Sequence, residues 1–144
     1  MTALNAAAAQ AELMEKEKHI VELQGRVQQL KSGLQNMSNH QVALEREKRR
    51  SAITLGELGT LDDSHHVFKG VGRMFVAATV PQLTAEYKDR EVKCSSEVAR
   101  LSEEKTKIAA AIKKEDEQLQ AAVGEFVNAV RLLQATQQLP QQQQ

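Results

Sequence analysis

The sequence contains few of the residues from which compact enzyme domains are built. Tryptophan is absent, the three aromatic residue types together make up 3% of the 144 residues, and there are two prolines. A compact domain of this length normally buries several large aromatic side chains in its core. The hydrophobic residues, 41% of the chain, are mostly Ala, Leu and Val. This composition favours long, exposed helices over a compact core.

Several other absences narrow the class of protein. The only cysteine, Cys94, excludes an intrachain disulfide and a cysteine-based metal site, and it fits a reducing compartment. The formal net charge is zero, with 19 basic and 19 acidic residues, which argues against a nucleic-acid binder that relies on global charge. No stretch approaches the roughly 20 apolar residues of a membrane span, and the start lacks the pattern of a secretory signal. We therefore expect a soluble, cytoplasmic protein that binds neither nucleic acid nor membrane.

Motifs that would supply catalysis or bind a cofactor are also missing. His65 and His66 are adjacent, so on a strand their side chains would point to opposite faces. Two side chains on opposite faces cannot bind the same metal ion. Gly70 and Gly72 lack both the GxGxxG context and the terminal Gly-Lys-Ser/Thr of phosphate-binding loops. No pair of nucleophilic or acid–base residues falls on a predicted pocket. We expect no enzyme activity, no cofactor and no metal site.

One apolar stretch in mid-chain, residues 67–77, differs from its surroundings, because β-branched and aromatic residues cluster there around glycines. Its centre, Gly72-Arg73, predicts the type II′ turn of a β-hairpin, since glycine at the first central position supplies a positive φ. In that register Val71 faces Met74. An isolated hairpin is marginally stable in water, so we expect neighbouring chains to complete the sheet. The candidate oligomerisation residues are Val67, Phe68, Gly70, Val71, Gly72, Arg73, Met74, Phe75 and Val76.

Two helical segments flank the hairpin, and each carries residues alternately three and four positions apart, the heptad pattern of a coiled coil. The second segment begins at Thr79, whose spacing from Gln82 is that of a capping box. The apolar seam residues are Leu13, Ile20, Leu23, Val27, Leu30, Leu34, Met37 and Leu44, then Leu83, Tyr87, Cys94, Val98, Leu101, Ile108, Ile112, Leu119, Val123, Phe126, Val130 and Leu133. The polar interruptions are Lys16, Gln41, Lys48, Glu91, Lys105 and Glu115.

Because a hairpin reverses the chain, the two helices can pair side by side. We predict a mainly α fold, a long antiparallel two-helix coiled coil joined by a short linker and one β-hairpin. The single domain comprises helix 1 over about 7–51, a linker over 53–62, the hairpin over 66–78, helix 2 over 79–136 and a disordered Gln-rich tail over 137–144. Pairing is expected to run from Ala52 opposite Gln82 to Leu13 opposite Val123, with both termini at the far tip.

The tip of this arm carries more apolar residues than one seam needs. If these side chains are exposed, they would bind unfolded chains by burying apolar surface without directional contacts. Such burial stabilises a complex by about 25 cal/mol per Å² of apolar surface. The sequence is equally compatible with their packing against the alanine-rich residues 3–11. The candidate client-binding residues are Leu4, Leu13, Met14, Phe126, Val127, Val130, Leu132 and Leu133.

The layout as a whole, with the hairpin motif Phe68-Lys69-Gly70-Val71-Gly72-Arg73-Met74-Phe75, resembles a β-class prefoldin subunit over roughly residues 10–135. The run from Gly70 to Phe75 specifically resembles a eukaryotic β-class subunit. The hairpin motif carries the resemblance, because coiled-coil arms would match many unrelated proteins.

The resemblance implies a heterohexamer of α-type and β-type prefoldin subunits, whose hairpins form a double β-barrel. It also implies an ATP-independent holdase, in which the arm tips capture nonnative proteins such as actin and tubulin and deliver them to the cytosolic group II chaperonin. The alternative is a structural coiled-coil adaptor that tethers partners and holds no unfolded clients.

Overall fold

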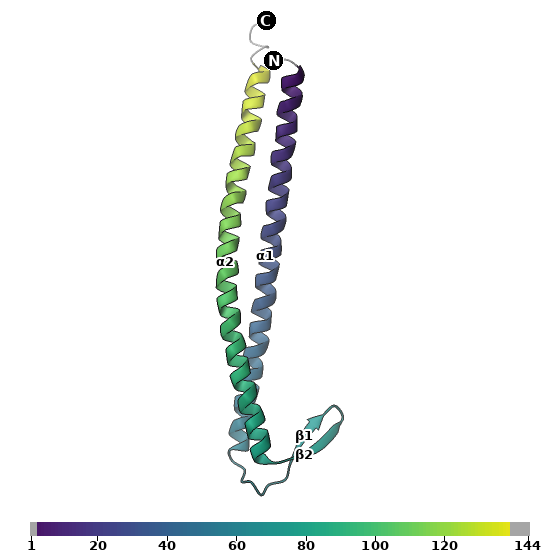
Figure 1. Cartoon of the computed structure of the whole chain (residues 1–144), viewed down its shortest axis with the longest axis vertical. Helices are drawn as coiled ribbons and strands as arrows, with labels where there is room; N and C mark the ends of the chain where they lie inside the picture. The colour runs from purple at the N-terminus through teal and green to yellow at the C-terminus, as the bar shows by residue number, and fades with distance from the viewer. Residues whose placement is uncertain (1–2, 139–144) are drawn as a thin grey trace. The chain divides into compact units, whose positions relative to one another are not determined.

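The structure is a computed structural model that describes residues 3–138 (Figure 1). Its elements are helix α1 (Ala3–Leu58), strands β1 (Val67–Val71) and β2 (Met74–Ala78), and helix α2 (Val80–Gln138). This confirms the mainly helical fold with one antiparallel hairpin. The described chain divides into two units: unit 1 combines the part up to Leu34 with the part from Lys107 onward, and unit 2 is Gln35–Thr106.

Both helices extend beyond their predicted ends. α1 continues to Leu58, so the linker predicted over 53–62 is instead the last turns of α1 followed by residues 59–66. The helix continues because its packing continues: Ser51 and Leu58 are both buried. The amide of Gly59 donates to the carbonyl of Leu55 at 2.9 Å and completes the last turn. α2 likewise includes Gln137 and Gln138, and the rest of the predicted tail, residues 139–144, lies outside the described residues.

The predicted pairing register of the two helices is wrong by about two turns. In unit 1, Leu13 lies with Ala129 and Leu133 rather than with Val123. In unit 2, Gln41 donates to Ser102 at 2.8 Å. The physical reason is the length of α1, which continues toward the hairpin past the predicted end and shifts the opposing residues of α2 accordingly.

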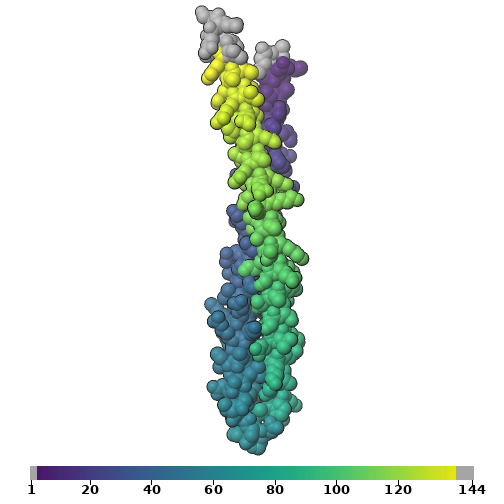
Figure 2. Space-filling model, turned by 90° about the vertical axis from the view of Figure 1, so that its left-hand side faces the viewer, coloured from purple at the N-terminus to yellow at the C-terminus, as the bar shows by residue number. Residues whose placement is uncertain are grey.

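In each unit the helices bury one stripe of side chains, as the seam predicts. Figure 2 shows the blue α1 and green α2 segments of unit 2 in close contact. The buried apolar residues of the described chain are Leu23, Val27, Leu58, Val80, Leu83, Cys94, Leu101 and Ala122.

Two predicted seam positions are displaced by one residue. Val123 is exposed and Ala122 is buried in its place, while Lys48 is exposed and Glu47 is half-buried. A straight helix of 3.6 residues per turn drifts by about 20° per heptad from a strict seven-residue repeat. The buried stripe therefore steps to a neighbouring position at intervals.

The hairpin has the predicted register, with Val71 opposite Met74 and Gly70 opposite Phe75. Gly72 has φ +61°, and Arg73 has no positive φ, which identifies the type II′ turn, because type I′ needs positive φ at both positions. A Cβ added to Gly70 would lie 4.0 Å from the Phe75 ring. The ring of Phe75 therefore packs over the bare backbone of its cross-strand neighbour.

The capping box at the start of α2 is also confirmed. The Gln82 amide donates to Thr79 Oγ1 at 3.3 Å, and the Thr79 amide donates to Gln82 Oε1 at 3.2 Å. Pro81 lies in this first turn, where its missing N–H leaves no intrahelical bond unmade. These local bonds fix the point at which β2 gives way to helix.

Candidate functional site

The hairpin exposes a dense set of apolar side chains. Phe75 is 79% exposed and Phe68 is 62% exposed, although both are large hydrophobic residues. We name Phe68, Val71, Met74, Phe75 and Val76 the hairpin surface. The sheet has two strands, so each strand also has an outer edge with no strand beside it among the described residues. Apolar side chains and unpaired strand edges together form a surface suited to another strand.

Ion pairs attach one face of the hairpin to the helices of unit 2. Lys69 of β1 lies 2.5 Å from Glu86 of α2, and Arg90 donates to the same carboxylate at 2.9 Å. Arg90 also lies 3.9 Å from Glu47 of α1 and 4.9 Å from the centre of the Tyr87 ring. The hydrogen bond from Lys69 lowers the pKa of Glu86 below its ordinary value, with a further contribution from Arg90. Phe68 and Phe75 lie on the opposite face from Lys69, because side chains alternate along a strand, and both are exposed.

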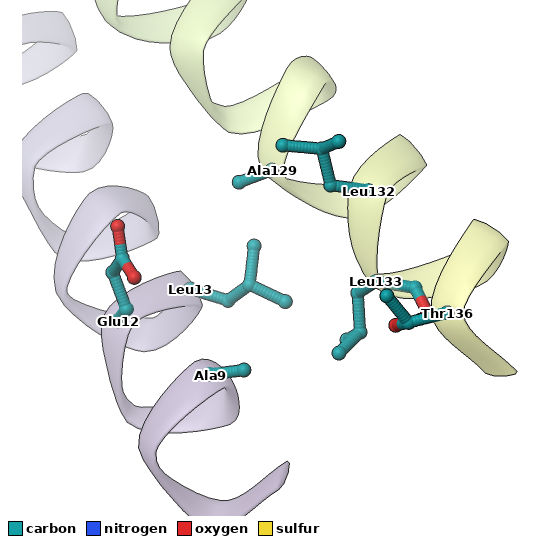
Figure 3. A pocket seen from close by; sticks show the side chains of 7 residues that line it. All are labelled: Ala9, Glu12, Leu13, Ala129, Leu132, Leu133 and Thr136. Atoms are coloured by element: carbon teal, nitrogen blue, oxygen red, sulfur yellow. The ribbon is translucent and has the colours of Figure 1, made fainter. Parts of the chain in front are cut away.

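In unit 1 the two helices form an apolar groove. Figure 3 shows that Leu13 points from α1 toward α2, where Ala129 and Leu133 lie. Leu132 borders the groove and is 69% exposed. The lining residues are Ala9, Glu12, Leu13, Ala129, Leu132, Leu133 and Thr136. The groove presents leucine side chains with carboxylate at one rim.

The eight predicted client-binding residues all belong to unit 1, and they divide into two sets. Four are exposed: Leu4, Met14, Val127 and Leu132. Four are half-buried between the helices: Leu13, Phe126, Val130 and Leu133. The two sets therefore differ in exposure, and Leu133 lies with Ala9 in the groove, as packing against residues 3–11 predicts.

The sequence reasoning missed the small residues of the groove. Ala9 and Ala129 face each other's helix there, with Thr136 at the edge. A usable signal was present, because Ala129 stands three residues after Phe126 and four before Leu133, which is seam spacing. Alanine there leaves space between the helices that a larger seam residue would fill.

Of the two histidines before the hairpin, His65 belongs to a turn with Asp62. His65 Nδ1 lies 2.9 Å from Asp62 Oδ1, and the Ser64 amide donates to the same oxygen at 2.9 Å. Hydrogen bonds from Ser64 and then His65 lower the pKa of the Asp62 carboxyl. Over residues 3–138, no three side chains of His, Cys, Asp and Glu come together to bind a metal ion. Neither helix, over the same residues, has an apolar run of the length and hydropathy that a bilayer-spanning helix requires.

Comparison with known proteins places this geometry in a family. Residues 21–126 match the family model described as prefoldin subunit. Prefoldin beta subunits from Methanosarcina barkeri and Methanosarcina mazei are 26% and 27% identical over 98 residues, which is 68% of this chain and 84% of each relative. The fold is similar to the crystal structure of the prefoldin beta subunit from Thermococcus strain KS-1, with a TM-score of 0.62 and 22% identity over 72% of this chain and 91% of that one.

The family match spans unit 2 with its hairpin and most of the helix pair. The exposed residues Leu4, Met14, Val127 and Leu132 lie outside the matched range. The aligned beta subunits specify the class within the family. This chain therefore belongs to the prefoldin family as a β-class subunit, a component of a chaperone complex with other prefoldin subunits and not a member of an enzyme family.

Proposed function

We propose that this chain joins α-type and β-type prefoldin subunits in a cytoplasmic heterohexamer that acts as an ATP-independent holdase. It captures nonnative proteins such as actin and tubulin and delivers them to the cytosolic group II chaperonin. The observation that carries the proposal is the hairpin surface, with Phe68 and Phe75 exposed on a two-stranded sheet. A sheet of this kind is marginally stable by itself and gains from further strands.

The hairpin surface supports assembly because its interactions are directional. An added strand pairs with the backbone along an open edge, which fixes its direction and register. Burying a Phe or Met side chain contributes about 1.5 to 3 kcal/mol relative to leaving it in water. Phe68, Met74 and Phe75 together therefore contribute several kcal/mol toward holding the subunit in a complex.

The helices of unit 1 support client holding because their interactions are not directional. Met14 and Leu132 are exposed within helices whose backbone groups are already hydrogen-bonded internally, and Leu4 is exposed in the first turn of α1. Such side chains gain free energy by covering any apolar surface, without specifying a partner's backbone geometry. Nonnative chains of many sequences offer such surface.

Assembly is tested by native mass spectrometry of the chain mixed with α-type partner subunits. The expected result is a hexamer that contains this chain. A structural adaptor has no reason to form a hexamer through its hairpin, so a monomer or a simple dimer under the same conditions would contradict the proposal.

Client holding is tested separately, by light scattering of a denatured protein diluted into the assembled complex without ATP. The complex should suppress aggregation, and a complex whose copy of this chain lacks residues 1–12 and 126–144 should suppress it less. Mass spectrometry of the truncated complex provides the control for assembly. If the truncated complex assembles fully and suppresses aggregation as well as the full-length complex, these segments do not hold clients.

A further inference from the structure

The outer face of α1 in unit 2 carries a second stripe, opposite the seam. Val42, Arg46, Arg49 and Ile53 are spaced by four, three and four residues, so at 3.6 residues per turn they lie along one line of the helix. Val42 is 47% exposed and Ile53 is 68% exposed. Arg46 and Arg49 between them are exposed as well. We name these four residues the outer stripe.

The arginines of the described residues divide into those with and those without a carboxylate partner, and the two of the outer stripe belong with Arg26, Arg73 and Arg131 among those without one. Among the described residues, Arg50 lies 4.0 Å from Glu47, and Arg90 pairs with Glu86. Arg100 pairs with two glutamates of its own helix. No ion pair within residues 3–138 involves Arg46 or Arg49. Their guanidinium groups are free to donate to an external anion.

We propose that the outer stripe binds an acidic amphipathic helix of a partner protein. Two carboxylates on successive turns of that helix accept hydrogen bonds from Arg46 and Arg49, and apolar side chains beyond them cover Val42 and Ile53. Spacing of three and four residues is the spacing by which one helix packs along another. Arginine suits the task because its planar group can bind a carboxylate through two parallel hydrogen bonds.

The surroundings of the outer stripe favour an acidic helix over a nucleic acid. Glu45 and Glu57 lie on opposite sides of the stripe, about 60° from its centre by helix geometry. The shallow groove beside Arg49 contains Glu45 and Glu91 together with Lys48 and Ala52. These carboxylates act on any anionic partner, so the choice rests on the apolar residues, and a phosphate backbone offers nothing apolar to cover Val42 and Ile53. An amphipathic helix offers apolar side chains there, and its acidic line can lie over Arg46 and Arg49.

This inference does not rest on the proposed client holding, since the outer stripe shares no residue with the hairpin surface or with the exposed set of unit 1. The test uses the full chain and a fluorescently labelled helical peptide with two glutamates and two leucines at the spacing of the stripe. A second peptide has lysines in place of the glutamates. Fluorescence anisotropy measures the affinity of each, with a single-stranded oligonucleotide as a third probe.

The acidic peptide should bind more tightly than the lysine peptide and the oligonucleotide, and its affinity should fall as salt rises. The Arg46→Glu/Arg49→Glu variant should lose about tenfold or more in affinity for the acidic peptide. The Arg26→Glu/Arg131→Glu variant changes the net charge equally at exposed positions elsewhere and should retain the affinity. Circular dichroism verifies that both variants are helical.

Three results would overturn the inference. One is equal binding of the acidic and lysine peptides. Another is an equal loss of affinity in the two charge-matched variants, since net charge alone would then explain the binding. The third is tighter binding of the oligonucleotide through Arg46 and Arg49, which would assign the stripe to nucleic acid.

Discussion

The hairpin and the helices of unit 1 both expose apolar side chains, but they expose them in different ways. In the hairpin, Phe68, Met74 and Phe75 lie on two five-residue strands whose outer edges pair with no other strand of residues 3–138. In unit 1, Leu4 and Leu132 are separate side chains on helices whose backbone is internally bonded. The hairpin therefore offers both side chains and backbone to a partner, and the helices offer side chains alone.

The difference indicates how one chain can be selective in one region and tolerant in another. A strand edge accepts a partner only in one direction and register, because the hydrogen bonds of the ladder must match. Isolated apolar side chains on a helix accept any apolar surface within reach. Under the proposed function, selective assembly and tolerant client binding are expected from the type of secondary structure that carries the exposed residues. Four experiments test this comparison.

The largest effect is expected for Phe75→Asp. An unpaired charge buried among the side chains of an assembled sheet costs several kcal/mol, so the subunit should leave the complex. Co-purification with tagged partner subunits measures the loss. Phe75→Leu keeps an apolar side chain at the position and should be recovered in the complex. Full recovery of the aspartate variant would show that the hairpin surface is not the assembly element.

A smaller effect is expected for Ile108→Ala or Ile112→Ala in the seam of unit 1. Truncating a well-buried isoleucine to alanine lowers the free energy of unfolding by about 2 to 5 kcal/mol. Ile108 and Ile112 are half-buried, so their loss should lie near the lower value. Urea denaturation followed by circular dichroism measures the change in the free energy of unfolding. The exposed Val92 gives the control, since Val92→Ala should change it by about 0.5 kcal/mol or less. The seam variants should still assemble, because their hairpin is intact.

A loss of client holding without loss of stability is expected when Leu4, Met14 and Leu132 are all changed to serine. These side chains are exposed, so the free energy of unfolding should change by about 1 kcal/mol or less. Aggregation suppression by the assembled complex should fall about threefold, a change of less than 1 kcal/mol in binding. Val92→Ser removes an exposed apolar residue of unit 2 and should leave suppression unchanged. If the triple variant suppresses aggregation fully, residues other than these three bind the nonnative clients.

The smallest effect is expected for the ion pair that attaches the hairpin. The pKa of Glu86 is lowered from its ordinary value of 4.5 in the folded state, so the pair stabilises the fold above that pH. The contribution is lost as the pH falls below about 4.5 through the folded pKa. The melting temperature of the Glu86→Gln variant should therefore be lower than that of the natural chain at neutral pH. The two melting temperatures should converge in acid. A difference independent of pH would exclude the ion pair as the cause.

The features that could be predicted from the sequence are those set by neighbouring residues. Gly72 fixes the turn and with it the hairpin register, and the hydroxyl and amide of Thr79 and Gln82 fix the start of α2. Each depends on chemistry within a few positions. The prediction therefore needed no knowledge of the opposing helix.

The features that could not be predicted depend on distant packing. The two glycines near its end favour an early stop for α1, yet the burial of Ser51 and Leu58 against α2 carries the helix to Leu58. The helix-pairing register followed this error. By contrast, exposure within the candidate set follows the predicted seam, because the half-buried Leu133 is a seam residue and the exposed Leu132 is not.

The two segments that connect the hairpin to the helices differ in length. Thr79 alone separates β2 from α2, whereas residues 59–66 separate α1 from β1. We expect a rotation of α2 about its own axis to turn the sheet more than a rotation of α1 does, because the longer connector can absorb the latter. Changes in connector length should likewise be better tolerated on the α1 side of the sheet than on the α2 side.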